Sequence, residues 1–131
     1  MKIIRSYFFL LLILLLACQG EKSKEETLNT QKRVSIAEIE AGIKAYIDAE
    51  TADNDGYFLI NEENQKLRLK LVRVHTEYLS NLGPSRHFAC VDLADEKGDV
   101  YDVDFFLEGE PGAMRVTETS LHKLNGKPFY T

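Results

Sequence analysis

The chain has 131 residues and a formal net charge of −5, from 16 Lys and Arg against 21 Asp and Glu. Residues 1–17 hold two cations, no acid and 14 apolar residues, so the remaining 114 residues carry a net charge of −7. This length fits one domain, and the acidic body excludes the clustered Lys and Arg that sequence-independent nucleic-acid binding requires. Two cysteines are too few for a disulfide scaffold.

The first 17 residues have the layout of a secretory signal peptide. Lys2 and Arg5 precede an apolar run over residues 7–17, which is shorter than the roughly 20 residues that a membrane-spanning helix needs. The run ends in Leu15-Leu16-Ala17-Cys18, which resembles the lipobox of bacterial lipoproteins. This resemblance implies that residues 1–17 are removed and that Cys18 carries a covalent lipid, and we expect no other cofactor.

The same resemblance predicts a location. A lipid on Cys18 would hold the protein in the bacterial cell envelope, and Gln19 in place of an aspartate indicates the outer membrane, on its periplasmic side or its surface. Residues 18–33 are mostly charged or polar, which predicts a flexible tether. We therefore divide the chain into a signal peptide (1–17), a lipidated cysteine with its tether (18–33) and a single domain (34–131).

A helix is predicted at the start of that domain. Ser35 and Glu38 have the spacing of a capping box, and apolar residues then recur at three- and four-residue steps. The pattern predicts an amphipathic helix over about residues 35–51. The turn-forming sequence of residues 53–56 ends it.

The period of the apolar residues then changes to two, which predicts β-strands. One long strand over about residues 66–78 changes parity at Leu71-Val72, which predicts a β-bulge, and residues 81–84 break it. Asn125-Gly126 is a strong signal for a hairpin turn. The other strands are predicted at residues 57–60, 87–94, 100–107, 113–124 and 127–130.

These elements predict an α+β domain, in which one N-terminal helix packs on a curled antiparallel meander sheet of about five strands. The order of elements resembles the cystatin-like superfamily. The inhibitory Gln-x-Val-x-Gly loop of cystatins is not in this sequence, so the resemblance does not imply protease inhibition. The body otherwise resembles uncharacterised bacterial envelope proteins.

The apolar pattern also predicts a register, with Val91 paired to both Val74 and Val103. The first face of the sheet should then meet the helix, and it collects Val72, Val74, Val91, Leu93, Val103 and Phe105. The second face collects the candidate ligand-binding residues Arg73, His75, Cys90, Asp92, Asp102 and Asp104, with the candidate contact aromatics Phe88 and Phe106 at one end. From the next strand, Arg115 and Thr117 could join this face, with Arg115 paired to Asp104.

Two functions remain open for this face. The first is a non-catalytic envelope lipoprotein, attached to the membrane by its lipid, that binds an envelope protein or a small ligand. The alternative is a small-molecule-binding or hydrolytic domain that uses the same residues, with His75 as a general base or with a hard cation at Asp92, Asp102 and Asp104. We expect no catalytic motif and no nucleic-acid partner. We also expect no metal site, because His87 and His122 have no short-spaced ligand partner. A calcium-stabilised turn at Asp53 and Asp55 is a third possibility.

Overall fold

The computed structural model describes residues 33–130. The predictions for the signal peptide, for Cys18 and for all but the last residue of the tether lie outside the described residues. The described part begins with helix α1, Ile36–Ala52. Ser35 and Glu38 cap it as predicted, since the Glu38 amide donates to Ser35 Oγ at 3.3 Å and the Ser35 amide donates to Glu38 Oε2 at 2.7 Å. Within residues 33–130, no helix is both long and apolar enough to cross a membrane.

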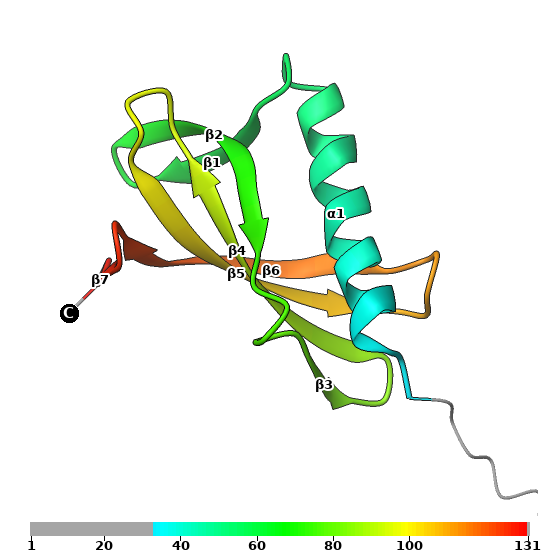
Figure 1. Ribbon diagram of the computed structural model, residues 1–131. Coiled ribbons are helices and arrows are strands. Elements are labelled where there is room, and N and C mark those ends of the chain that lie inside the picture. The colour runs from blue at the N-terminus through cyan, green and yellow to red at the C-terminus, as the bar shows by residue number, and fades with distance from the viewer. Residues whose placement is uncertain (1–32, 131) are drawn as a thin grey trace, which may run out of the picture. The chain divides into compact units, whose positions relative to one another are not determined.

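A curled antiparallel sheet follows the helix, so the α+β class is confirmed (Figure 1). The strands lie in the order β1-β2-β4-β5-β6-β7, and β3 pairs with β4. The sheet thus has seven strands where about five were expected. Their bounds are β1 Phe58–Glu62, β2 Gln65–Val74, β3 Ser80–Gly83, β4 Arg86–Ala94, β5 Val100–Glu108, β6 Arg115–Leu124 and β7 Lys127–Pro128.

The predicted long strand over residues 66–78 is wrong in its second half. Strand β2 ends at Val74, a turn occupies residues 76–78, and β3 then begins at Ser80. The Tyr78 amide donates to the His75 carbonyl, which closes this turn, and Leu79 is buried directly after it. Strands β2 and β3 pair with different halves of β4, so they share one side of that strand with a gap between them.

The register along the centre of the sheet is the predicted one. Val74 lies opposite Val91, and Val91 lies opposite Val103. The predicted bulge is confirmed as a register shift between Leu71 and Arg73. The bulge turns Val72 outward, where it is 59% exposed, so its placement on the first face was wrong.

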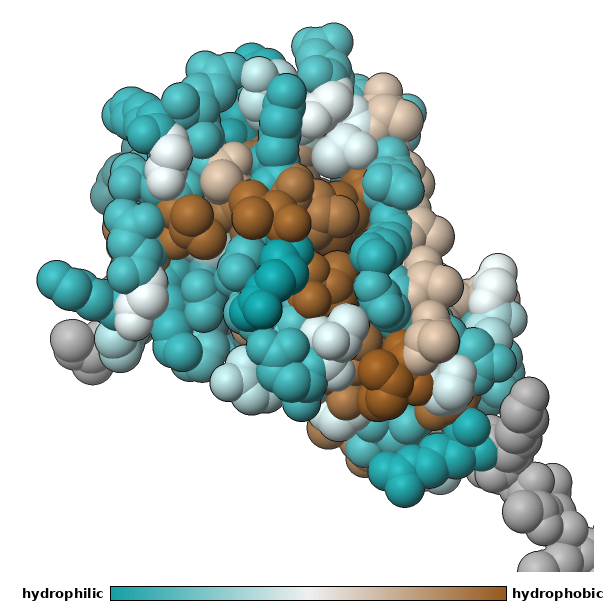
Figure 2. Space-filling view, in the orientation of Figure 1, coloured by the Kyte–Doolittle hydropathy of each residue, from teal (hydrophilic) through white to brown (hydrophobic). Residues whose placement is uncertain are grey.

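The first face of the sheet packs against the helix and forms the core. Ile39, Ile43 and Ile47 are fully buried on the helix side, which is the side viewed in Figure 1. Phe58 and Phe105 contact each other edge to face with ring centroids 5.7 Å apart. Figure 2 shows hydrophobic surface on this side of the molecule, bordered by hydrophilic side chains. The helix therefore packs on the first face and leaves some hydrophobic surface exposed on this side of the molecule.

Val91 on β4 and Val72 at the bulge of β2 allow a matched test of this packing. Val91→Ala should lower the free energy of unfolding by about 2 kcal/mol, because Val91 is fully buried. Val72→Ala should change it by less than about 0.5 kcal/mol, because most of its side chain is already in water. Urea denaturation of both variants measures the difference, and equal losses would contradict the assigned faces.

Candidate functional site

The strand register brings the predicted residues of the second face together. Cys90 lies directly opposite Asp104, and Asp92 lies opposite both Arg73 and Asp102. Three carboxylates from two neighbouring strands therefore share one face. Like charges in such positions repel each other, so the surrounding groups have to compensate them.

His75 supplies one part of this compensation. It directly follows β2, its amide donates to the Cys90 carbonyl at 2.9 Å, and its ring is buried. Nε2 lies 2.7 Å from Asp92 Oδ1. Nδ1 lies 2.6 Å from an Arg73 guanidinium nitrogen and 3.1 Å from Glu77 Oε1. Nδ1 can accept from Arg73 only when the ring is neutral, and it can donate to Glu77 only when it carries a proton.

The protonation of His75 is decided by opposing effects. Burial favours the neutral ring, but the hydrogen bonds to Asp92 and Glu77 outweigh it, so the pKa of His75 is raised above its usual value of 6.5. Arg73 opposes this rise through its own positive charge. The two carboxylates therefore shift the equilibrium of the His75 ring toward its protonated form.

The pKa of the Cys90 thiol is also raised, and for a thiol this favours the neutral form. Burial, and next the Asp104 carboxylate beside it, raise the pKa of the thiol to about 12. Asp102 and Asp92 add to this effect. A thiol in such surroundings stays protonated at neutral pH and is a poor nucleophile.

Strand β6 closes the other side of the face. His122 Nδ1 lies 3.5 Å from Asp104 Oδ2, and Lys123 Nζ lies 3.8 Å from Asp102 Oδ2. The predicted pairing of Arg115 with Asp104 is wrong. The strand register places Ser120 opposite Asp104, and Arg115 lies opposite Glu108 and binds its carboxylate at 2.7 Å.

Thr117 and the two phenylalanines complete the account of this face. Thr117 Oγ1 donates to the Phe106 carbonyl at 3.3 Å, so this side chain is used within the sheet. Phe88 and Phe106 pair across β4 and β5 with ring centroids 5.5 Å apart, and both are half-buried. Phe88 is also part of the wall of a cleft.

This hollow, which we call the acidic cleft, has a volume of about 320 Å³. Its floor holds Cys90, Asp102 and Asp104. Within the described residues, Asp104 Oδ1 is a buried side-chain oxygen that has no hydrogen-bond partner. The residues that line the cleft are Tyr78, Ser80, Phe88, Cys90, Asp102, Asp104, His122 and Lys123.

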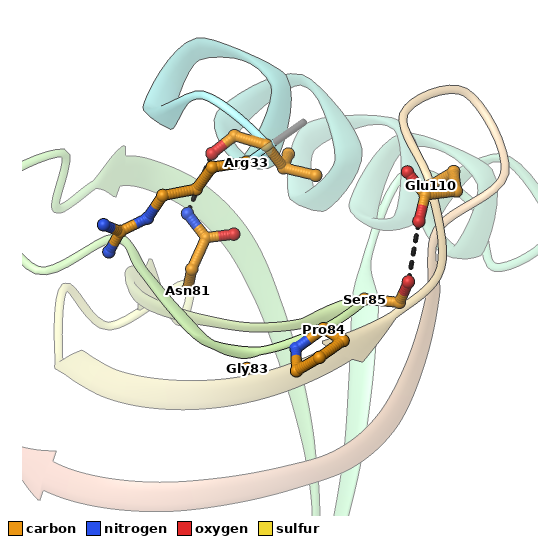
Figure 3. Close-up of a pocket in the computed structure, with 7 residues that line it drawn as sticks. Arg33, Asn81, Gly83, Pro84, Ser85 and Glu110 are labelled. Carbon is orange, nitrogen blue, oxygen red and sulfur yellow. Dashed lines mark hydrogen bonds between the residues drawn. The ribbon is translucent and has the colours of Figure 1, made fainter. Parts of the chain in front are cut away.

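A second hollow, of about 420 Å³, lies beside Arg33 (Figure 3). Two of its polar side chains are already paired. Asn81 donates to the Val34 carbonyl at 2.8 Å, and Ser85 donates across the hollow to Glu110 at 2.6 Å, as Figure 3 shows. The acidic cleft is the stronger candidate site, because Asp104 Oδ1 there is buried without a hydrogen-bond partner among the described residues.

The remaining candidates have structural explanations. His87 is buried, with Nδ1 3.0 Å from Asn81 Oδ1 and Nε2 3.0 Å from the Gly109 carbonyl. Asp53 caps the end of helix α1, and Asp55 adopts a positive φ of 56° in the turn that follows. Neither aspartate belongs to a group of metal-ligating side chains within residues 33–130. These contacts favour a helix-to-strand turn over a calcium loop.

Four residues of the site were not predicted from the sequence. His122 lies two residues after Ser120, which is opposite Asp104, and the register shift that follows brings Lys123 opposite Asp102. The sequence has no distinct signal for this register. Tyr78 and Ser80 line the cleft because the chain turns between β2 and β3. Residues 75–77, which follow the buried Val74, are polar, and this polar stretch is the signal that could have indicated the turn.

We predict that the His75 ring titrates above pH 6.5, because Asp92 and Glu77 stabilise the imidazolium. The protein is first treated with a chelator, so that no metal ion competes for the ring. Its NMR resonances measure the midpoint. Asp92→Asn should lower that midpoint, and His122→Gln should leave it unchanged. A midpoint that does not move in Asp92→Asn would contradict the assigned contact.

The same shift has a consequence for stability. A raised folded pKa stabilises the fold fully below the unfolded value of about 6.5, and this contribution is lost as the pH rises through the folded pKa. His75→Gln should therefore destabilise the protein more at about pH 5.5 than at about pH 8.5. Urea denaturation at the two pH values gives the comparison.

Comparison with known proteins found no relative of this chain. No family model matches the chain, and neither the curated proteins nor the solved structures contain a match. The contacts of the acidic cleft are therefore the basis on which a function is assigned.

Proposed function

We propose that this chain is a membrane-anchored bacterial envelope lipoprotein whose folded domain is a non-catalytic binding module. The signal-like residues 1–17 and the lipobox ending at Cys18 support the anchor. The acidic cleft is the binding site, and its ligand is a small molecule or an ion that carries positive charge. The helix-then-meander order also supports a cystatin-like relationship for the fold.

The observation that carries the binding site is the Asp104 side chain. Asp104 lines the cleft, and its Oδ1 atom is buried without a hydrogen-bond partner among the described residues. A buried acceptor of this kind is costly unless a donor or a cation reaches it. Asp102 also lines the cleft and adds to the negative charge, and Phe88 and Tyr78 supply aromatic rings, which can bind an organic cation.

The chemistry of the same residues supports binding more than catalysis. The pairing of His75 with Asp92 would suit a general base, which is the observation that favours a hydrolytic alternative. However, the thiol beside it has a pKa of about 12 and is not an activated nucleophile. The raised pKa of His75 also reduces the fraction of neutral ring that could accept a proton.

The anchor has a direct test. Cys18→Ala should release the protein from membranes and abolish incorporation of a labelled acyl chain, because the lipid is attached through the Cys18 sulfur. Cys90→Ala is the matched control, and this variant should stay membrane-bound and labelled. Fractionation and acyl labelling measure both properties, and labelling that persists without Cys18 would show that the proposed anchor is wrong.

The cleft is tested with a small organic dication. Addition of 1,4-diaminobutane should shift the amide resonances of Cys90, Asp102 and Asp104, whereas the neutral isostere 1,4-butanediol should not. Asp104→Asn should weaken binding at least about fivefold, since one unit charge at the site contributes on the order of 1 kcal/mol.

A matched charge control comes from the helix. Asp48→Asn removes the same charge at an exposed helix position, and it should bind the diamine like the unmodified protein. Shifts that are equal for the diamine and the diol, or equal losses in the two variants, would rule out the cleft as a cation site.

A further inference from the structure

Three side chains at the edge of the acidic cleft offer a nitrogen, a sulfur and an oxygen atom to one point. The ligand atoms of His75, Cys90 and Asp102 all lie within 4.8 Å of one another. They come from the end of β2, from β4 and from β5, so the strand register and the turn after β2 bring them together. His75 is 8% exposed and Cys90 is 5% exposed, so two of the three groups are buried.

The geometry points to a site for a divalent transition metal ion of the zinc type, held by His75 Nε2, Cys90 Sγ and an Asp102 carboxylate oxygen. This inference rests on the proposed function, because it names the kind of cation that the acidic cleft takes. A mixed set of imidazole, thiolate and carboxylate suits Zn²⁺, whereas Mg²⁺ and Ca²⁺ prefer oxygen ligands alone. No metal site was expected from the sequence, because His87 and His122 have no short-spaced ligand partner, and His75 was not grouped with Cys90 and Asp102 as metal ligands.

The surroundings of His75 suit a metal ligand. Nε2 is the ring nitrogen that faces the sheet, as its contact with Asp92 shows, and Nδ1 faces Arg73 at 2.6 Å and Glu77 at 3.1 Å. An ion on Nε2 replaces the hydrogen bond to Asp92, and Nδ1–H then donates to Glu77 Oε1 while the exposed Arg73 side chain moves away from Nδ1. A carboxylate behind the ligating imidazole is the usual arrangement in zinc sites, because it orients the ring and makes it a better ligand.

The other two ligands need only local change. Zn–N and Zn–S bonds are about 2.0–2.3 Å long, so the three ligand atoms have to come somewhat closer than 4.8 Å. Asp102 can rotate for this purpose, because its contact with Lys123 is long at 3.8 Å. When the metal–sulfur bond forms, the Cys90 thiol releases its proton to solvent.

The negative charge at this position also favours an ion. Asp92 and Asp104 flank the three ligands across the strand register, and a divalent cation relieves their repulsion. Asp104 lies directly opposite Cys90, so its unpaired Oδ1 is available to a fourth ligand such as a metal-bound water. Three protein ligands and one open position form a common arrangement for zinc.

Cobalt spectroscopy tests the site in the full chain, purified in detergent without metal and carrying Cys18→Ser so that Cys90 is its single thiol. Co²⁺ should bind at one equivalent and produce a thiolate-to-cobalt charge-transfer band that Zn²⁺ displaces. Cys90→Ser should remove this band, and His75→Gln and Asp102→Asn should each weaken binding at least about tenfold. Glu77→Gln should weaken it by about tenfold and keep the band.

His122→Gln is the control for unspecific histidine binding and should leave the Co²⁺ affinity unchanged. Circular dichroism on the same samples identifies any variant that fails to fold. The parent protein, which carries only Cys18→Ser, remains decisive in that case. If it shows no charge-transfer band with Co²⁺, the proposal is overturned. Binding that is retained in Cys90→Ser, or that is lost only in His122→Gln, also overturns it.

The test separates this inference from the proposed function. If 1,4-diaminobutane still perturbs the cleft while Co²⁺ gives no charge-transfer band, the metal site is wrong and the cationic binding site stands. If neither probe binds, both proposals fall. A band together with diamine binding supports both, with the two cations competing for Asp102.

Discussion

Repulsion between carboxylates on neighbouring strands is the constraint on which the second face of this sheet depends. Asp92 and Asp102 are direct cross-strand partners, and Asp104 is one pleat further along β5. Charges at such separations interact by roughly 1–4 kcal/mol, depending on how far water reaches them. Cationic groups therefore flank the row on both sides, with Arg73 and His75 at one side and β6 at the other.

The compensation is unequal along the row. Asp92 has a short contact with His75 and a longer one with Arg73, whereas Asp104 interacts with the Cys90 thiol and, through one of its oxygens, with the more distant His122 ring. The negative charge is thus better compensated at Asp92 than at Asp104, which lines the acidic cleft. Asp92 is therefore held rigidly by its partners, and Asp104 is the member of the row that is available for binding.

Much of this arrangement could be predicted from residue patterns. The capping box at Ser35 gave the helix, and the pairing of Val74, Val91 and Val103 gave the register, because burial of one face allows a single alignment of the strands. Cys90 opposite Asp104 then followed without further information. These features are local, or they are fixed by a continuous apolar face.

The features that the patterns missed depend on backbone irregularities. The turn after His75 divides a long alternating stretch, and the register of β6 places Ser120 opposite Asp104 with His122 near it, so Arg115 lies further along the sheet. Val72 was assigned to the core because it was grouped with Val74 after the predicted bulge, whereas the register shift leaves Val72 itself unpaired and exposed. Bulges and turns of this kind are set by contacts with neighbouring strands, so a single sequence carries little trace of them.

The far edge of the sheet has a consequence for behaviour at high concentration. Strand β7 has only two residues, and one of them is Pro128, which has no amide hydrogen to offer. A short edge of this kind is a poor template for a strand from another molecule, so self-association by sheet extension is disfavoured there. Copies crowded together would thus remain separate molecules along this border instead of joining into continuous intermolecular sheets.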